Sequence, residues 1–248
     1  MRTVNSSDES VQEYFGRYHE AYRNSESHAR GQDLARLIEI LHLAPKSLVL
    51  DAACGTGHTA LELARQGHHV IGLDVTREML EEAESLAQQS HLSIQWVQGN
   101  VHHLPWEPDT FDAITCRRAA HHFSDLAHFL REAKRVLKPG GHLGISDMTA
   151  PSDAIEWLNQ LERYRDGSHE AARSANEWAH LIAEAGLDLV TLNVSAEIMT
   201  AEQWLAPVPP DSHEGHQTLM FLADHPPATI FRNGQFYKYR LILAAVKT

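Results

Sequence analysis

The segment from Leu48 to Ala64, LVLDAACGTGHTALELA, constrains the fold of this chain more than any other. Leu48-Val49-Leu50 is a short apolar run that ends on an acid, Asp51. A turn of small residues, Ala52 to Gly57, follows, and Thr59 to Ala64 has the apolar spacing of an amphipathic helix. Strand, glycine turn and helix together predict a platform where the backbone can approach a ligand closely.

Strand and helix patterns alternate along the chain as far as Met148. Short apolar runs are separated by helical patterns, several of which end at glycine or proline. Such alternation predicts an α/β chain with a parallel, doubly wound sheet, right-handed crossovers and helices on both faces. The expected strands are Leu48–Leu50, Val70–Leu73, Ser93–Val97, Phe111–Cys116 and His142–Asp147, and the expected helices are Thr59–Gln66, Glu78–Gln88 and Asp125–Leu137.

Two helices are expected ahead of the first strand. Val11 to Tyr22 carries aromatic residues at helical spacing, and Gln32 to Leu41 has one apolar face. The aromatic residues of the first helix are explained either by packing or by a lid that lies over a ligand. We therefore assign residues 1–47 as an N-terminal helical lid, with Tyr18 as a candidate for substrate contact.

The regular alternation ends after Pro151. Ser174 with Glu177 three residues later is a capping box, which predicts a helix start. Two late strands are expected to add an antiparallel C-terminal edge to the parallel sheet. No repeat or low-complexity segment marks a boundary, so we expect one domain, 1–248, with a core at 48–148 and a substrate-side, sheet-completing region at 149–248. The elements expected there are helices Ile155–Tyr164, Asn176–Ala185 and His213–Ala223, strands Leu187–Val194 and Phe236–Val246, and a connection Glu202–Leu205.

Charge and composition exclude several classes of function. The formal net charge of -12 argues against sequence-independent nucleic-acid binding, which needs a basic face to neutralise phosphates. No run approaches the roughly 18 apolar residues of a membrane span, and the first ten residues lack the apolar segment of a signal peptide. Cys54 and Cys116 both lie at ends of predicted core strands, as expected of buried thiols in a reducing compartment. We therefore expect a cytoplasmic protein without membrane or nucleic-acid partners.

Polar residues follow the predicted strands at the edge of the sheet where ligands bind. Asp51, Asp74, Asn100 and the segment Arg117–His122 all lie at such strand ends. The turn Gly55-x-Gly57-x-x-Ala60 is compatible with a dinucleotide site. Asp51 counts against that ligand, because a carboxylate ahead of the glycines repels a pyrophosphate and suits an ammonium group. Asp74 can accept two hydrogen bonds from ribose hydroxyls.

These motifs together resemble those of the class I S-adenosylmethionine (SAM)-dependent methyltransferases. Leu48–Ala64 is similar to motif I, Asp74 to the ribose-binding acid, Gly99-Asn100-Val101 to the adenine-binding segment, and Leu137–Asp147 to the fifth-strand motif. Thr115–Asp125, with the later RDGSHE and EWAHLIAEAG, is similar to the UbiE and YcgJ-like small-molecule enzymes. The resemblance implies a Rossmann-like, seven-stranded methyltransferase fold, SAM as cofactor, S-adenosylhomocysteine (SAH) as its product, and methyl transfer to a small molecule.

The resemblance also implies a set of cofactor-binding residues at the strand ends. One departure is Asn100, where many relatives have an aspartate. The asparagine can still accept a hydrogen bond from the adenine amino group through its amide oxygen. The implied cofactor residues are Asp51, Ala53, Gly55, Gly57, His58, Thr59, Asp74, Val75, Met79, Asn100, Val101 and Arg117.

Methyl transfer from a sulfonium mainly requires that the acceptor be aligned with the methyl group. An acceptor hydroxyl, thiol or acidic carbon also needs a base, and His121 and His122 follow the fourth strand on the acceptor side. The alternative for both histidines is that they pack or bind backbone beside the cofactor. His122 is also a candidate for substrate contact.

Three further residues are candidates for substrate binding. Arg118, like Arg117 before it, either binds an acidic substrate or pairs with a surface carboxylate. Arg165 and His169 lie on a loop that either covers the site or only connects two helices.

Other functions fit parts of the sequence. A protein that binds SAM or SAH without transferring a methyl group would have the same cofactor motifs. An NAD-type oxidoreductase is disfavoured by Asp51 and by the LKPGG stretch, and a protein or nucleic-acid methyltransferase by the absence of N/D-P-P-Y/F after the fourth strand. The pairs His102-His103 and His121-His122 lack metal-ligand spacing, so no metal is expected. The protein is expected to be a monomer or a homodimer.

Overall fold

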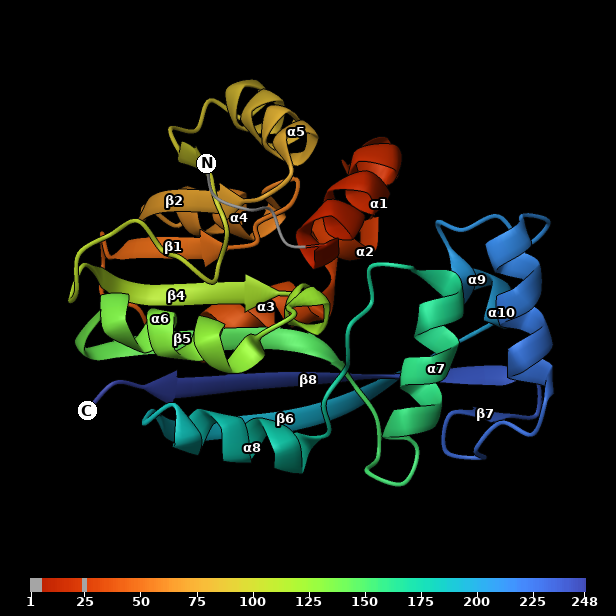
Figure 1. Ribbon diagram of the computed structural model, residues 1–248. Coiled ribbons are helices and arrows are strands. Elements are labelled where there is room, and N and C mark those ends of the chain that lie inside the picture. The colour runs from red at the N-terminus through yellow and green to blue at the C-terminus, as the bar shows by residue number, and fades with distance from the viewer. Residues whose placement is uncertain (1–5, 24–25) are drawn as a thin grey trace.

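A mixed sheet covered by helices forms the frame of the computed structural model, which describes residues 6–23 and 26–248 (Figure 1). The main strands lie in the order β3-β2-β1-β4-β5-β8-β6, and the short β7 pairs with β8. The strands are β1 (Leu48–Ala52), β2 (His69–Asp74), β3 (Gln95–Gln98), β4 (Phe111–Arg117), β5 (Leu137–Thr149), β6 (Asp188–Met199), β7 (Phe231–Arg232) and β8 (Gln235–Val246).

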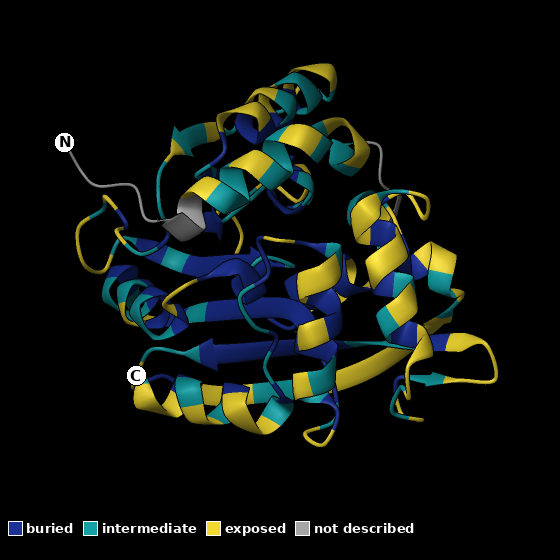
Figure 2. Cartoon of the chain, turned by 45° about the vertical axis from the view of Figure 1, so that its right-hand side comes forward, coloured by how far each residue is buried: buried dark blue, intermediate teal, exposed yellow. Residues whose placement is uncertain are grey.

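The strand directions confirm a mostly parallel sheet with an antiparallel C-terminal strand. β3, β2, β1, β4 and β5 are parallel neighbours, whereas β8 is antiparallel to both β5 and β6. The order also places β8 one position in from the edge, so that β6 is the outermost strand and is largely exposed (Figure 2). β8 is therefore buried on both sides along much of its length.

Helices cover both faces of the sheet. The second expected helix and the helix after the glycine turn pack on one face, around Val49, Val70 and Ala113. The helices after β4 and before β6 pack on the other face, around Leu50, Phe111 and Ile114. The helices are α1 (Ser6–Arg23), α2 (Glu26–Arg30), α3 (Gln32–Glu39), α4 (His58–Arg65), α5 (Arg77–Gln89), α6 (Leu126–Val136), α7 (Ile155–Arg165), α8 (Ala175–Glu184), α9 (Ala201–Leu205) and α10 (His213–Ala223).

The turn between β1 and α4 requires its second glycine. Gly57 has a φ of 81°, in the left-handed region. A Cβ there would lie 2.7 Å from the Trp96 ring and 3.0 Å from the Ala83 Cβ. Gly57 therefore lets α4 start close to β3 and α5, which keeps the turn compact below any ligand.

Most predicted elements are present, with three differences. The predicted connection Glu202–Leu205 lies within helix α9, because Thr200 forms a capping box with Gln203. β5 starts at Leu137 rather than at His142, since Leu137 already pairs with Phe111 before the register shifts. The sequence did not predict α2 or β7. The capping box of Ser174 and Glu177 at the start of α8 is confirmed.

A second apolar cluster lies beyond the end of the main core. β5, β6 and β8 are longer than the other strands and extend toward α7, α9 and α10 (Figure 1). There Trp204 stacks on Phe236, with ring centroids 4.5 Å apart, and both side chains are buried. The long strands thus hold a second packed region beside the carboxyl ends of the central strands. In the described part of the chain no helix combines the length and apolar character that a membrane crossing needs.

Candidate active site

A pocket opens at the carboxyl ends of the central strands, where ligands of such sheets bind. We call it the turn pocket, because the glycine turn after β1 forms its floor. It collects ten of the twelve residues that the sequence assigned to the cofactor: Ala53, Gly55, His58, Thr59, Asp74, Val75, Met79, Asn100, Val101 and Arg117. Gly57 is absent from the lining, since its role is to make room for Trp96.

Asp74 joins the end of β2 to the glycine turn. Its Oδ2 accepts a hydrogen bond from the Gly55 N–H at 2.8 Å, and its Oδ1 accepts from the Thr76 N–H at 2.8 Å. Burial raises the pKa of this carboxyl. Each carboxylate oxygen can accept a second hydrogen bond. The side chain is therefore fixed in place with acceptor capacity left for the two hydroxyls of a ribose.

Asp51 does not line the turn pocket, and its contact with the cofactor stays a prediction. Its Oδ1 accepts from the Thr115 hydroxyl at 2.8 Å, and its Oδ2 accepts from the Ala60 N–H in the first turn of α4 at 3.1 Å. Burial raises the pKa of Asp51 to about 7. The carboxyl thus lies beneath the glycine turn, where it acts on a bound cation only through space.

The adenine side of the turn pocket has one amide and an apolar wall. Asn100 Oδ1 accepts from the His102 N–H at 2.8 Å, which fixes the loop after β3. Met79 and Val101 are buried beside it. An amide next to buried apolar side chains suits a purine, so the residues present fit the cofactor that the sequence implies.

Helices α1 and α2 cover the turn pocket. Phe15 and Tyr22 line it, their rings 5.2 Å apart, and His28 of α2 lines it too. The covering helix is held to α5, because Arg23 forms an ion pair with Glu82. Tyr18 lies outside the lining of both cavities and packs against Tyr14, with ring centroids 4.9 Å apart, which favours the packing alternative over a substrate contact.

Arg117 and Arg118 both form ion pairs with one carboxylate, that of Asp33, at the start of α3. Arg117 Nε lies 2.7 Å from Asp33 Oδ2, and Arg118 Nη2 lies 2.7 Å from Oδ1. Burial alone would raise the pKa of Asp33, but the two guanidinium groups hold it well below its usual range. The arginines therefore tie the N-terminal helices to the end of β4, and Arg118 has a carboxylate partner, which is one of the two alternatives that the sequence left open.

A second cavity, which we call the basic cavity, adjoins the first. It is bounded by the turn after β4, the end of β5, the end of α7, β8 and the β6–α9 segment. Five residues line both cavities, so the two meet where these side chains lie: Phe15, Tyr22, His28, Arg118 and His122. The other residues of the basic cavity are Ala21, His121, Asp147, Met148, Arg165, Asp166, Glu197, Ile198, Met199, Gln203, Ala206, Pro207, Lys238 and Arg240.

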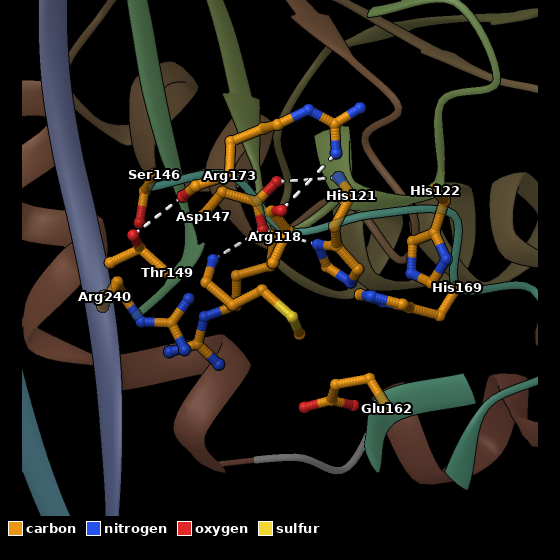
Figure 3. A network of polar contacts seen from close by, with 12 residues as sticks. Arg118, His121, His122, Ser146, Asp147, Thr149, Glu162, His169, Arg173 and Arg240 are labelled. Atoms are coloured by element: carbon orange, nitrogen blue, oxygen red, sulfur yellow. Dashed lines mark hydrogen bonds and ion pairs between the residues drawn. The ribbon is translucent and has the colours of Figure 1, made fainter. Parts of the chain in front are cut away.

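His121 is oriented by a buried carboxylate (Figure 3). Its Nδ1 lies 2.5 Å from Asp147 Oδ1, and Asp147 also accepts from the backbone N–H groups of His121 and Met148 at 2.9 and 2.7 Å. Burial would raise the pKa of Asp147, but the His121 imidazole brings it below its ordinary value. Because a carboxylate only accepts, Nδ1–H is the donor and Nε2 keeps its lone pair. His121 is thus arranged as a proton acceptor.

His122 lies at the junction of the two cavities. Its Nδ1 lies 3.1 Å from the Ser168 carbonyl oxygen, and its ring meets Phe15 edge-on at 5.0 Å. Burial, and then the neighbouring His121, lowers the pKa of His122 to about 4. The ring is therefore neutral near pH 7 and a weaker base than an ordinary histidine.

His169 and Arg165 were both expected on a loop, but Arg165 is the last residue of α7 and only His169 lies in the loop after it. His169 lines neither cavity, because its Nε2 is bound to Asn159 Oδ1 at 2.9 Å behind His121. This position favours the alternative of a connecting loop, and a substrate contact of His169 stays a prediction. Arg165 lines the basic cavity and pairs with the buried Glu162 at 2.7 Å. Within residues 6–23 and 26–248, no group of three or more His, Cys, Asp or Glu side chains is arranged to hold a metal ion.

Lys238 and Arg240 were not predicted as site residues. They alternate with Tyr237 and Tyr239 on the last strand, which the sequence suggested only as a sheet-completing element. The available signal was two basic residues at spacing two, in line with the buried Phe236 and Ile242.

Comparisons with known proteins agree with this geometry. A family model described as "Methyltransferase domain" matches residues 50–145. YcgJ of Bacillus subtilis, an uncharacterized methyltransferase, is 41% identical over 167 residues, which cover 66% of each chain. The C-methyltransferase UbiE of Bartonella tribocorum, of ubiquinone and menaquinone biosynthesis, is 34% identical over 60% of this chain and 68% of its own. These alignments span about two thirds of the relatives' lengths.

Solved structures match over more of the chain. The YcgJ structure gives a TM-score of 0.78 at 32% identity and covers 87% of this chain and 97% of YcgJ. A Bacillus halodurans protein assigned to the methyltransferases gives a TM-score of 0.79 at 31% identity, covering 88% of this chain and 99% of that protein.

Proposed function

Since this chain belongs to the class I methyltransferase family, we propose that it transfers a methyl group from SAM to a small molecule held in the basic cavity. The observation that carries the proposal is the junction of the two cavities at His122 and Phe15. The cofactor site and the second cavity adjoin at side chains that line both, so two reactants bound in them would lie next to each other. Alignment of two reactants is the main requirement of this reaction.

SAM, when bound, supplies an electrophilic methyl group on a positively charged sulfur. Asp74 would hold the ribose, and Asn100 with Met79 and Val101 would hold the adenine. Asp51 favours the cationic cofactor from beneath the turn, since opposite charges attract more strongly in a buried site. Phe15 and Tyr22 close the pocket from above and exclude water from the junction.

We assign His121 as the base that accepts the acceptor's proton. An acceptor O–H, S–H or acidic C–H would give its proton to Nε2 as the acceptor atom takes the methyl group. Asp147, 2.5 Å from Nδ1, stabilises the imidazolium that forms. His122, whose Nδ1 faces Ser168, lines the junction at which acceptor and cofactor would meet.

The test is turnover of SAM with fractionated small metabolites, followed by mass spectrometry. We expect formation of SAH together with a metabolite that has gained one methyl group. Binding of SAH without any methylated product would favour the alternative of a SAM-binding protein without transfer. Stabilisation by NAD and not by SAH in a thermal-shift assay would contradict the proposal and favour an oxidoreductase.

The cellular setting of this activity is also a proposal. The free thiols of Cys54 and Cys116 support a reducing, cytoplasmic location. The basic residues of the second cavity lie inside the protein, which supports a small-molecule partner rather than a nucleic acid. A monomer or a homodimer stays our expectation, and size-exclusion chromatography with light scattering tests it.

A further inference from the structure

The basic cavity concentrates positive charge in an acidic protein. The chain has a formal net charge of -12, yet Arg118, Arg165, Lys238 and Arg240 all line this one cavity, against the three carboxylates Asp147, Asp166 and Glu197. Arg118 and Arg165 have carboxylate partners at 2.7 Å, Asp33 and Glu162. Whether the cavity contains unpaired positive charge therefore depends on Lys238 and Arg240.

Lys238 forms no ion pair within 4 Å in the part of the chain that the structure describes, although the more distant Glu162 attracts it. None of its contacts there is a hydrogen bond or an ion pair. Glu197 lies opposite it on β6, but that side chain is exposed and forms no ion pair with Lys238. The ammonium group is thus open to a ligand in the cavity.

Arg240 lies at the limit of ion-pair distance from a carboxylate that already has two closer partners. Its Nε is 3.9 Å from Asp33 Oδ2. That oxygen already accepts from Arg117 Nε at 2.7 Å and Arg118 Nε at 3.0 Å. Figure 3 shows the side chain of Arg240 reaching from β8 toward that of Arg118. Two guanidinium groups side by side leave a local excess of positive charge.

The fold explains why these two residues face the cavity. Lys238 and Arg240 share one face of β8 with Ile242 and Ala244, because side chains alternate along a strand. Ile242 and Ala244 are covered by Leu37 and Leu41, at and just after α3. Arg240 lies beside the first turn of α3. Lys238 lies farther along the strand, past the start of this helix, and therefore faces the cavity.

The charges of this cluster destabilise one another. Burial, followed by the repulsion of Arg240, Arg165 and Arg118, lowers the pKa of Lys238 to about 7. Burial and the repulsion of Arg118 lower the pKa of Arg240 to about 10. A bound anion would relieve both effects, since an opposite charge favours the protonated forms.

We propose that the methyl acceptor carries a carboxylate or phosphate group, which Lys238 and Arg240 bind in the basic cavity. This inference rests on the proposed function and names the substrate class of the same site. Arg240 pairs across the sheet with Met148, next to Asp147 and therefore close to His121. Lys238 lies two residues, or ~7 Å, farther along the strand. The proposed base, His121, lies beside Asp147 at the other end, so we place the acidic group at the Lys238 end and the reacting atom at the His121 end.

The test measures binding of simple anions to the full chain saturated with SAH. Benzoate is compared with its neutral counterpart benzamide by isothermal titration calorimetry, and inorganic phosphate is added as a competitor. We expect benzoate to bind and benzamide not to bind. Displacement of benzoate by phosphate indicates a phosphate site. Binding of benzoate that phosphate does not displace indicates a carboxylate site. Either result supports the proposal.

The variant Lys238→Met should weaken benzoate binding about tenfold or more, the loss expected for one charged contact. Lys46→Met removes the same charge from an exposed loop before β1 and should leave benzoate binding unchanged. Lys238→Met should melt no lower than the natural protein, because the lysine is repelled and unpaired in the described chain. Equal benzoate binding by Lys238→Met and the natural protein, or equal binding of benzoate and benzamide, would overturn the proposal.

SAH affinity separates this inference from the proposed function. Lys238 does not line the turn pocket, so SAH should bind equally well to Lys238→Met and to the natural protein. Failure of the natural protein to bind SAH would contradict the methyltransferase assignment. The benzoate measurements, repeated without SAH, would still decide whether the cavity holds an anion.

Discussion

At the scale of single residues, His121 and His122 have different environments although they are neighbours in sequence. His121 faces a carboxylate, Asp147, whereas His122 faces a carbonyl oxygen and an aromatic ring. Their ring centroids are only 4.0 Å apart. The Asp147 carboxylate holds the Nδ1 side of the His121 ring and leaves its Nε2 available to an acceptor. Of the two residues that the sequence offered, the structure therefore favours His121 as the base.

Loss of the base should slow methyl transfer while leaving cofactor binding intact. We expect His121→Ala and Asp147→Asn each to lower kcat by about 10²–10⁴-fold for an acceptor that must lose a proton. SAH affinity should not change, since neither residue lines the turn pocket. His225→Ala, on an exposed loop, is the matched control. A kcat that is unaffected in His121→Ala would show that no base acts here.

The buried carboxyl of Asp51 should make stability depend on pH. Burial raises its pKa to about 7, above that of an aspartate in the unfolded chain. Its protonated form is therefore favoured in the folded state, and this stabilisation is present in acid and is lost as the pH rises through about 7. We expect the melting temperature of the natural protein, relative to Asp51→Asn, to fall between about pH 5 and 8. A constant difference across that range would contradict the raised pKa.

At the scale of elements, the N-terminal helices are fixed to the sheet by charge as well as by apolar contact. Leu34, Leu37 and Ile38 bury the apolar face of α3 against the sheet. Asp33 at the start of the same helix accepts hydrogen bonds from Arg117 and Arg118. Asp33 therefore adds a charged contact to the apolar ones that hold α3 on the sheet, beside the helices that cover the turn pocket.

Removal of the Asp33 charge should be costly, because two buried guanidinium groups would lose their partner. We expect Asp33→Asn to lower the free energy of unfolding by about 3–5 kcal/mol, measured by urea denaturation. Glu39→Gln breaks the exposed Arg36–Glu39 pair of the same helix and should cost less than about 1 kcal/mol. Similar losses in the two variants would mean that the buried pair contributes little.

At the scale of the whole molecule, the basic cavity lies between two packed regions. The main core surrounds β1, β4 and β5, and the second cluster surrounds Trp204 and Phe236. β5 and β8 contribute residues to both clusters, so the cavity between them depends on how the second cluster packs. That continuity favours the single domain expected from the sequence, which stays a prediction.

Loosening the second cluster should affect the two cavities differently. Trp204→Ala should cost about 3–5 kcal/mol of stability and weaken benzoate binding, with SAH affinity unchanged at temperatures below the melting transition. The control Leu63→Ala removes a buried side chain of α4. It should cost about 2–5 kcal/mol of stability and leave benzoate binding unchanged. Parallel losses of SAH and benzoate binding in Trp204→Ala would show that the two regions are not separable.

The sequence by itself determined the sheet of alternating strands and helices, the glycine turn and most of the turn pocket. Those features depend on local patterns: a strand ends, a turn follows, and residues at neighbouring strand ends meet at one edge. Asp74 and Asn100 could be assigned because the motif places each directly after a strand. The capping box of Ser174 was equally local.

Only the tertiary structure decided which distant side chains share a cavity. Arg118 meets Asp33, and Lys238 lies in the same cavity as His121, across more than a hundred residues of sequence in the second case. Tyr18, His169 and Asp51 were assigned to the site and lie outside the linings of both cavities, because the partners that hold them come from packing. The position of β8 between β5 and β6 brings two basic residues to the acceptor side. Such contacts depend on which strands become neighbours, and no local pattern specifies that.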